Sequence, residues 1–233
     1  MAPLTRADET IDSFLNGELR IIQSQKGYRF SVDALLLAEF VSIREGDFVV
    51  DLGAGCGIIS LFLALRRKPG YVIGIELQQQ LASQAQRNIA LNKLGGKITV
   101  IRGDLRRLPL AGGVADVVVC NPPFRQVKSG RINPDIIKAI SRHELSATPD
   151  AILAAGKTLL KRGGRLALIY PATRLTEIFT RMSAEGLEPK RLQIIFPDSA
   201  SQAKLALIEG RLQGRSGLKI LPPLFGQGEY SIT

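Results

Sequence analysis

The sequence predicts an α/β fold built on a doubly wound, mostly parallel sheet of seven strands. From residue 48 onward, short apolar segments alternate with helix-length segments, a pattern typical of parallel sheets that carry helices on both faces. The last two strand-like segments follow each other without a helix between them, so we expect an antiparallel C-terminal edge. A length of 233 residues suits one large domain over residues 46–233, preceded by a smaller segment over residues 1–45.

Each expected strand is a short apolar run, and each of the first three has an acidic residue at or beside its carboxyl end. The strands cover residues 48–52, 71–76, 98–104, 115–120, 165–170, 191–196 and 204–213. The helices cover residues 58–67, 78–94, 148–160 and 174–186. Pro69-Gly70 and Gly95-Gly96 end the first two helices. Thr148 is the expected N-cap of the third helix, with Pro149 in its first turn, and Gly163-Gly164 is expected to close it.

Residues 1–45 do not follow this alternation. They contain a loop that leads into an apolar helix within residues 25–41, with Ser31 as a plausible cap. We interpret this segment as an N-terminal cap over the carboxyl edge of the sheet, and an ordinary covering helix is the alternative.

Charge and composition limit the function. The chain carries a net charge of +10, and residues 121–233 hold 17 basic and nine acidic residues, against 14 and 12 in residues 1–120. A basic surface attracts polyanions such as nucleic acids, although it can also serve solubility alone. No apolar run approaches the ~20 residues of a membrane span, and the N-terminus lacks a secretory signal, which indicates a cytoplasmic protein. The two cysteines, Cys56 and Cys120, lack metal-ligand spacing, so neither a disulfide scaffold nor a metal site is expected.

A glycine-rich turn follows the first strand, with the sequence DLGAGCG at residues 51–57. Glycines without a Cβ let the backbone approach a ligand closely, and ligands of such sheets bind outside the carboxyl ends of the strands. The spacing is G-x-G-x-G and not the dinucleotide-binding G-x-G-x-x-G. Asp51 beside the turn would repel a pyrophosphate but suits a ligand with an ammonium or sulfonium group.

Two more acids end neighbouring strands. Glu76 is placed to accept hydrogen bonds from two ribose hydroxyls, and Asp104 from an adenine amino group. Tyr28 and Phe30 are expected to pack on the same ligand from the N-terminal segment, although plain core packing explains them equally well. The expected cofactor-binding residues are Tyr28, Phe30, Asp51, Gly53, Ala54, Gly55, Gly57, Glu76, Leu77, Asp104, Leu105 and Asn121.

Together with Asn121-Pro122-Pro123-Phe124, these motifs resemble those of the class I S-adenosylmethionine-dependent methyltransferases. The tetrapeptide matches the [DNS]-P-P-[YFW] signature of the enzymes that methylate amines and amides. Residues 26–38, 129–144 and the terminal LPPLF segment are more specific, and they resemble the bacterial tRNA-Val (adenine-37, N6) methyltransferase family. This resemblance implies a Rossmann-like methyltransferase sheet, S-adenosylmethionine as the cofactor and tRNA as the substrate.

The resemblance gives the tetrapeptide a chemical role. A base amine is a poor nucleophile because its lone pair is delocalised into the ring. The side-chain oxygen of Asn121 and the carbonyl of Pro122 can each accept one N–H, which aims the lone pair at the methyl group. Pro122 and Pro123 fix the backbone, and Phe124 offers a stacking face for the base.

The segment after the tetrapeptide is expected to contact the RNA backbone, with a lid over the pocket as the alternative. It carries five basic residues, which are Arg125, Lys128, Arg131, Lys138 and Arg142. His143, the one histidine of the sequence, is expected to be structural or to touch RNA, and neither cysteine is expected to be a nucleophile.

Four other functions remain open at this level. Guanine-N2 methylation of rRNA uses the same tetrapeptide, but those enzymes carry an additional domain. Release-factor glutamine methyltransferases have a larger domain before the glycine loop and prefer NPPY. A DNA methyltransferase would need a target-recognition domain, and a non-enzymatic nucleic-acid binder would not need Glu76, Asp104 and the tetrapeptide intact.

Overall fold

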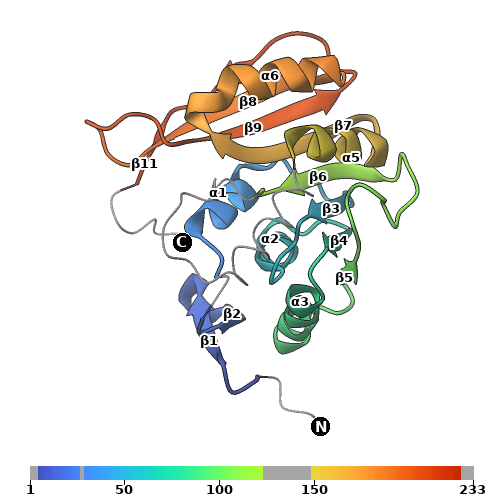
Figure 1. The fold of residues 1–233 in the computed structure, drawn as a ribbon, viewed down its shortest axis with the longest axis vertical. Helices are drawn as coiled ribbons and strands as arrows, with labels where there is room; N and C mark the ends of the chain where they lie inside the picture. Colours follow the sequence, from blue (N-terminus) through green and yellow to red (C-terminus); the bar gives the residue numbers. More distant parts are fainter. Residues whose placement is uncertain (1–4, 27–28, 123–147, 227–233) are drawn as a thin grey trace.

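A computed structural model of the chain describes residues 5–26, 29–122 and 148–226 (Figure 1). Its main sheet has the strand order β10-β8-β9-β7-β6-β3-β4-β5, and β11 also pairs with β8. The strands are β3 (Phe48–Leu52), β4 (Tyr71–Glu76), β5 (Ile98–Arg102), β6 (Ala115–Cys120), β7 (Leu160–Pro171), β8 (Leu187–Phe196), β9 (Leu205–Leu212), β10 (Lys219–Ile220) and β11 (Leu224–Phe225). The first seven are the predicted strands, whereas the two-residue strands β10 and β11 were not predicted.

The direction of the strands confirms the expected doubly wound topology. Strands β5, β4, β3, β6 and β7 are parallel neighbours, so their carboxyl ends meet at one edge of the sheet. Strand β9 runs antiparallel to both β7 and β8, between which it lies. The antiparallel strand is therefore β9, which lies between β7 and β8 and not at the edge of the sheet. Strands β10 and β11 pair with the outer side of β8 and run parallel to it.

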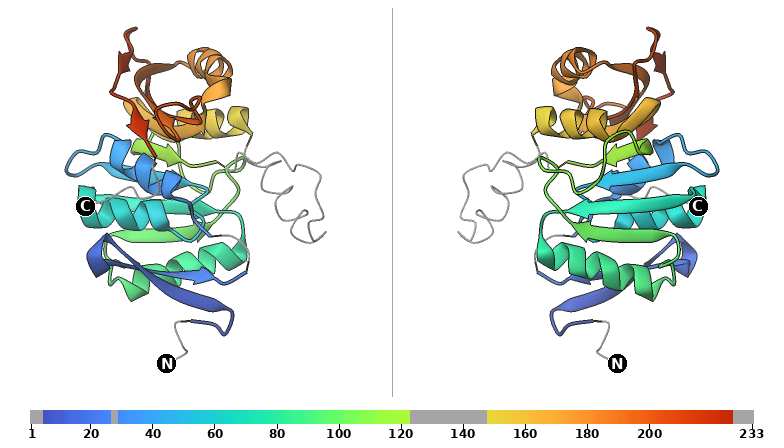
Figure 2. Two further views of the ribbon diagram at one scale, coloured as in Figure 1. Left: turned by 90° about the vertical axis from the view of Figure 1, so that its left-hand side faces the viewer. Right: turned by 90° about the vertical axis from the view of Figure 1, so that its right-hand side faces the viewer.

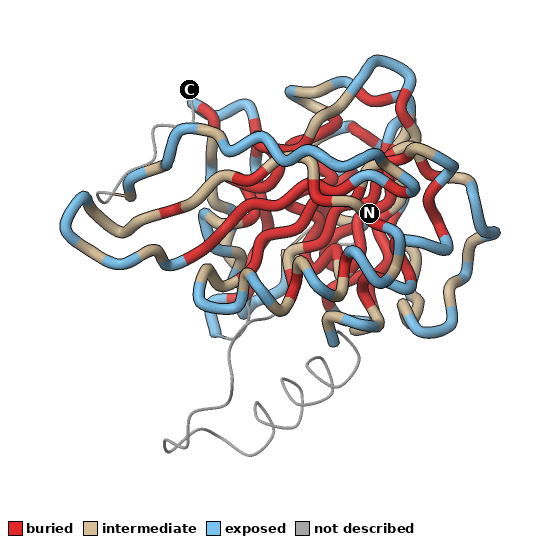
Figure 3. The backbone as a smooth tube through the Cα atoms, turned by 90° about the horizontal axis from the view of Figure 1, so that it is seen from above, coloured by how far each residue is buried: buried red, intermediate tan, exposed pale blue. Residues whose placement is uncertain are grey.

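Helices cover both faces of the sheet. The helices α1 (Val32–Phe40), α2 (Ile58–Phe62) and α3 (Gln79–Leu91) contribute to one apolar cluster, and α5 (Pro149–Leu159) and α6 (Leu175–Ala184) contribute to a second. Figure 2 shows α6 with β8 and β9 at one end of the molecule and the N-terminal strands at the other. The buried residues are concentrated along the central strands (Figure 3).

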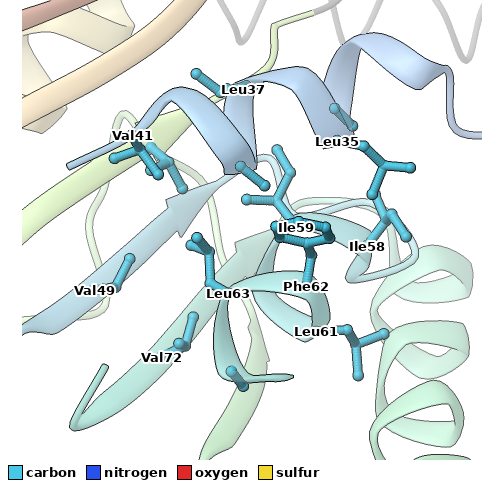
Figure 4. Packing of buried hydrophobic residues seen from close by; sticks show 14 of the residues in the cluster. Leu35, Leu37, Val41, Val49, Ile58, Ile59, Leu61, Phe62, Leu63 and Val72 are labelled. Carbon is cyan, nitrogen blue, oxygen red and sulfur yellow. The ribbon is translucent and has the colours of Figure 1, made fainter. Parts of the chain in front are cut away.

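The packing between α1, α2 and the sheet is made by large aliphatic side chains and one aromatic ring. Phe62 is fully buried between α1 and the strands, beside Ile59 and Leu63 (Figure 4). Burying a side chain of this size stabilises a fold by about 1.5–3 kcal/mol. The glycine-rich turn before α2 is thus attached to a well-packed element.

Two helix ends differ from the prediction. The segment 58–67 is an α-helix only to Phe62 and continues as a π-helical turn over Leu63–Arg67. Helix α5 ends at Leu159, so Gly163-Gly164 does not close it but lies inside β7, where the register to β6 shifts. Gly163 has a φ of +75°, which a glycine adopts at low cost in such a bulge. The predicted N-cap is confirmed, because Thr148 Oγ1 accepts a hydrogen bond from the Ala151 amide at 3.3 Å.

The N-terminal segment contains a β-hairpin that was not predicted. Strands β1 (Glu9–Phe14) and β2 (Leu19–Ser24) pair antiparallel around a 3-10 turn, η1 (Leu15–Gly17), and β2 lies against α3. The expected apolar helix is α1, and Ser31 occupies its N-cap position. The Ser31 hydroxyl donates to Asp33 at 3.0 Å and does not accept from the helix backbone. No helix in the described residues is long and apolar enough to cross a membrane.

Candidate active site

The glycine turn between β3 and α2 has the backbone shape that only glycine adopts easily. Gly53, Gly55 and Gly57 have φ angles of +73°, +57° and +86°. The amides of Gly53 and Ala54 both donate to the carbonyl of Ile75 in β4, at 2.9 and 3.1 Å. A Cβ on Gly53 would meet no atom within 4 Å, so the turn offers an open backbone surface there. This surface lies at the carboxyl edge, where a ligand of such a sheet binds.

Glu76 at the end of β4 holds this turn in place. Its side chain is fully buried, and its Oε2 accepts a hydrogen bond from the Gly55 amide at 2.8 Å. Its Oε1 accepts from the Gln78 amide at 2.8 Å, next to the start of α3. The backbone carbonyl of Glu76 also accepts from Gly103, which follows β5, at 3.0 Å. One residue therefore ties the ends of three strands together, and the same carboxylate is the expected ribose ligand.

Asp51 lies under the turn and not on its surface. The side chain is fully buried, and Oδ2 accepts a hydrogen bond from the Ser60 hydroxyl of α2 at 2.8 Å. Burial raises the pKa of Asp51 from 3.8 to about 7, which the hydrogen bond from Ser60 only partly opposes. A direct contact between Asp51 and an ammonium or sulfonium group stays a prediction.

Asp104 follows β5 and is engaged by a neighbour two residues along the chain. The Arg106 guanidinium donates to both carboxylate oxygens, at 2.6 to 3.1 Å, and the Arg106 amide donates to Oδ1 at 2.9 Å. The guanidinium holds the pKa of Asp104 below its usual range. Leu77 and Leu105 are half-buried beside these acids. An adenine amino group would therefore compete with Arg106 for the Asp104 carboxylate. The sequence alone did not reveal this competition.

Asn121 and Pro122 follow β6, the strand between β3 and β7. Cys120 pairs with Leu52 of β3, so Asn121 lies one strand away from Gly53, about 4.8 Å in sheet spacing. Asn121 is half-exposed and Pro122 is buried. The structure therefore brings the start of the tetrapeptide beside the glycine turn.

Several predicted site residues lie outside the described residues. They are Tyr28, Pro123, Phe124, Arg125, Lys128, Arg131, Lys138, Arg142 and His143. Phe30 is described, and its ring packs edge-on against Phe14 of β1 at 5.0 Å. Its amide donates to the buried side chain of Gln23 at 3.1 Å, so the hairpin positions this residue. Its contact with a cofactor stays a prediction.

Asn88 on α3 is a structural partner of the site that sequence reasoning missed. It is fully buried, and its Nδ2 donates to the carbonyl of Cys56 in the glycine turn at 2.9 Å. Its Oδ1 accepts from the Ile22 amide of β2 at 2.6 Å, and its Nδ2 also donates to the Ile22 carbonyl at 3.2 Å. The signal was a polar residue on the buried, mostly apolar side of the helix, where Gln84 is also buried. Asn88 thus connects the turn to the N-terminal hairpin.

The two cysteines are not nucleophiles at neutral pH. Both cysteines are buried, and burial raises the pKa of Cys56 to about 12 and that of Cys120 further still, so neither is a thiolate at neutral pH. Among the described residues, no group of three or more His, Cys, Asp or Glu side chains could hold a metal ion.

Solved structures of methyltransferases have the same fold as this chain. A predicted O-methyltransferase from Agrobacterium tumefaciens superposes with a TM-score of 0.67 at 21% identity, covering 85% of this chain and 91% of that one. The geranyl diphosphate C-methyltransferase of Streptomyces coelicolor, solved with S-adenosyl-L-homocysteine, has a TM-score of 0.57 at 15% identity, covering 78% of each chain. At these identities the likeness shows the fold alone.

Sequence comparisons identify the family to which the chain belongs. The model of the methyltransferase small domain matches residues 28–181. A Porphyromonas gingivalis protein named tRNA1(Val) (adenine(37)-N6)-methyltransferase is 31% identical over 86% of this chain and 81% of its own length. A Tolumonas auensis protein of the same name is 28% identical over 75% of this chain and 72% of its own. The chain therefore belongs to the methyltransferase small domain family and, within it, to the family of the tRNA1(Val) (adenine(37)-N6)-methyltransferases.

Proposed function

We propose that this chain transfers a methyl group from S-adenosylmethionine to N6 of an adenine in the anticodon loop of a tRNA. The observation that carries this proposal is the position of Asn121, one strand away from a glycine turn that Glu76 holds in place. The relatives of the same family carry the name of this reaction.

The residues of the carboxyl edge fit S-adenosylmethionine. The open surface at Gly53 lets a ligand approach the backbone closely, the Glu76 carboxylate suits the ribose hydroxyls, and Asp104 suits the adenine amino group. When bound, the cofactor supplies a methyl group activated by a sulfonium leaving group.

Asn121 and Pro122 provide the orientation that the transfer needs. The side-chain oxygen of Asn121 and the carbonyl oxygen of Pro122 each accept one N–H of the target amine. The nitrogen lone pair then points away from both acceptors and toward the methyl carbon. With S-adenosylmethionine bound, its sulfonium would supply the methyl group and take up the carbon–sulfur electron pair, and the methylated amine would release one proton to water. Orientation of two bound reactants is worth several orders of magnitude in rate. No dedicated base is required before the transfer, because the amine becomes acidic only once it carries the methyl group.

The five basic residues after the tetrapeptide are proposed to hold the RNA backbone. Neutralising Lys128 and Arg131 together should flatten the dependence of RNA affinity on salt, by about 0.7 in slope for each single-strand phosphate that is no longer neutralised. Lys68 and Lys97 provide the matched control, because both are exposed and precede β4 and β5 at the opposite edge of the sheet. An unchanged slope in the first double variant would favour a lid over the pocket.

Identification of the methylated nucleoside tests the proposal directly. The protein is incubated with labelled S-adenosylmethionine and unmodified tRNA, the RNA is digested, and the labelled nucleoside is identified. We expect N6-methyladenosine, and no label when guanosine replaces adenosine at position 37. Label in N2-methylguanosine, or only in a release factor offered in parallel, would overturn the proposal.

A further inference from the structure

A pair of aromatic rings, an exposed one and a half-buried one, lies at the carboxyl end of β8. Phe225 of β11 is 50% exposed, and its ring lies 5.7 Å from that of Phe196 at a tilt of 32°. The two residues are register partners, and the Gly226 amide donates to the Phe196 carbonyl at 2.8 Å. In Figure 1, β11 lies beside β8 at the outer end of the sheet. The pair is thus a fixed feature of the sheet edge.

The LPPLF segment brings Phe225 to this place. Leu221 donates its amide to the Leu192 carbonyl at 2.8 Å, and the side chain of Gln193 donates to the Pro222 carbonyl at 2.9 Å. Leu224 packs against the core cluster of the α1–α2 face. Because side chains alternate along a strand, Phe225 points to the other face, where its ring contacts that of Phe196 and the residue stays 50% exposed. Core packing explains Leu224 but not Phe225.

A lysine lies beside this ring pair. The Lys204 amide donates to the Ile195 carbonyl of β8 at 2.9 Å, and its carbonyl accepts from Ala172, which follows β7, at 3.1 Å. The Lys204 side chain is exposed, and no described residue forms an ion pair with it. The nearest acid of the same loop, Asp198, is already bonded to the Ala200 amide and the Ser201 hydroxyl.

The ring pair and Asn121 both lie at the carboxyl edge of the sheet, where the parallel strands end. From β6 the path crosses β7, β9 and β8 to reach β11, which is four strand spacings or about 19 Å across the sheet. The strand register places Phe196 three residues beyond the level of Asn121, about 10 Å along the strands, so the separation is roughly 22 Å. At about 3.4 Å per stacked nucleotide, this distance corresponds to about six or seven nucleotides. A single strand whose target base lies at Asn121 can therefore reach Phe225.

We propose that Phe196 and Phe225 form a stacking platform for an unpaired base of the RNA substrate, a few nucleotides from the methylated adenine, with Lys204 on the adjacent phosphate. This inference rests on the proposed function. Aromatic faces next to a cation are the means by which proteins hold single-stranded RNA, because every base offers a face for stacking. An RNA loop fits the exposed aromatic surface and the positive charge together, in a chain of net charge +10.

Variants of Phe225 test the platform through RNA affinity. Phe225→Ala should weaken binding of an unmodified anticodon stem–loop about 5- to 150-fold in fluorescence anisotropy, while cofactor affinity measured by calorimetry stays unchanged. Phe225→Trp keeps a stacking face and should retain the affinity, whereas Phe225→Leu keeps apolar volume without that face and should lose it. Lys204→Gln should lower the salt slope by about 0.7.

Ile220→Ala is the matched control. Ile220 is 67% exposed on β10, which pairs with the same strand β8 but carries no ring. Its variant should bind RNA as the unmodified protein does. An equal loss of affinity in Ile220→Ala would show that the effect comes from a weakened sheet edge and would overturn the platform.

The failures of the two proposals are distinguishable. If the unmodified protein methylates adenine in tRNA and Phe225→Ala binds RNA normally, the platform alone is overturned. If the unmodified protein neither binds nor methylates tRNA, the proposed function fails and the platform fails with it.

Discussion

Replacing Glu76 by glutamine should weaken both the fold and cofactor binding. In the folded protein each oxygen of this carboxylate accepts one backbone N–H, from Gly55 and from Gln78, both at 2.8 Å. A glutamine has one acceptor oxygen, so one of the two amides would face another donor at a fully buried position. Loss of a hydrogen bond to a charged group costs about 1.5–3 kcal/mol in the free energy of unfolding.

The expected consequences are measurable by calorimetry. For a domain of this size, the loss of stability corresponds to a fall in Tm of roughly 3–12 °C. The affinity for S-adenosylmethionine should fall about tenfold or more, because the ribose hydroxyls lose a charged acceptor and the glycine turn loses its support.

Glu185→Gln is the control for the removal of a carboxylate charge. Glu185 forms a partly exposed ion pair with Lys157 at 3.0 Å, and such pairs contribute at most about 1 kcal/mol. We expect normal cofactor affinity in this variant. A Glu76→Gln protein that melts and binds the cofactor as the control does would refute the reasoning about the turn.

Three further predictions concern the acids and the amide of the same edge. Asn121→Ala should lower kcat about a hundredfold or more with little change in RNA affinity. Asn121→Asp should retain part of the activity, because a carboxylate still accepts the N–H. Single-turnover kinetics measure both effects, and near-normal transfer in the alanine variant would show that the residue is structural. Asp104→Ala should weaken cofactor binding, whereas Arg106→Ala should leave it equal or tighter, because the competing guanidinium is gone; weaker binding in both variants would contradict a role for Asp104 as the adenine acceptor. Burial raises the folded pKa of Asp51 from 3.8 to about 7, so its contribution to stability is present below pH 4 and is lost as the pH rises through 7. Asp51→Asn cannot ionise, and urea unfolding across this range should show the unmodified protein losing stability relative to the variant, while parallel pH curves would mean that the carboxyl ionises freely in the fold.

The sequence was sufficient for the parts of the fold that local pattern determines. The seven long strands were predicted because each is a run of apolar residues between turn residues, and the antiparallel element because no helix separates β8 from β9. The acids Asp51, Glu76 and Asp104 were located at strand ends by the same pattern. Their carboxyl-edge position then follows from the parallel order of β3, β4 and β5.

The N-terminal hairpin was missed because its stability comes from distant residues. The sequence of β1, ETIDSF, is polar, and Ile22 of β2 is held by Asn88, which lies 66 residues away. The ion pair between Glu9 and Arg87 spans 78 residues. No periodicity within residues 1–45 can show such partners.

The other errors arise where tertiary pairing overrides a local signal. The glycines at 163–164 suggested a helix end, but the pairing of Leu160 with Ala115 draws the chain into β7 earlier and places them in a bulge. The roles of Glu76 as a support of the turn and of Arg106 as a competitor for Asp104 depend on side-chain geometry, on which a one-dimensional pattern carries no information.

The short strands β10 and β11 also affect how the protein behaves among copies of itself. Without them, the outer side of β8 would be an open strand edge that can pair with another chain and start aggregation. The amides of Leu221 and Gly226 occupy carbonyls of β8 at Leu192 and Phe196. Of the four residues between them, Pro222 and Pro223 have no N–H to offer to a further strand. The segment thus pairs with the outer side of β8 but offers few N–H donors to a further strand, which disfavours edge-to-edge pairing with another chain.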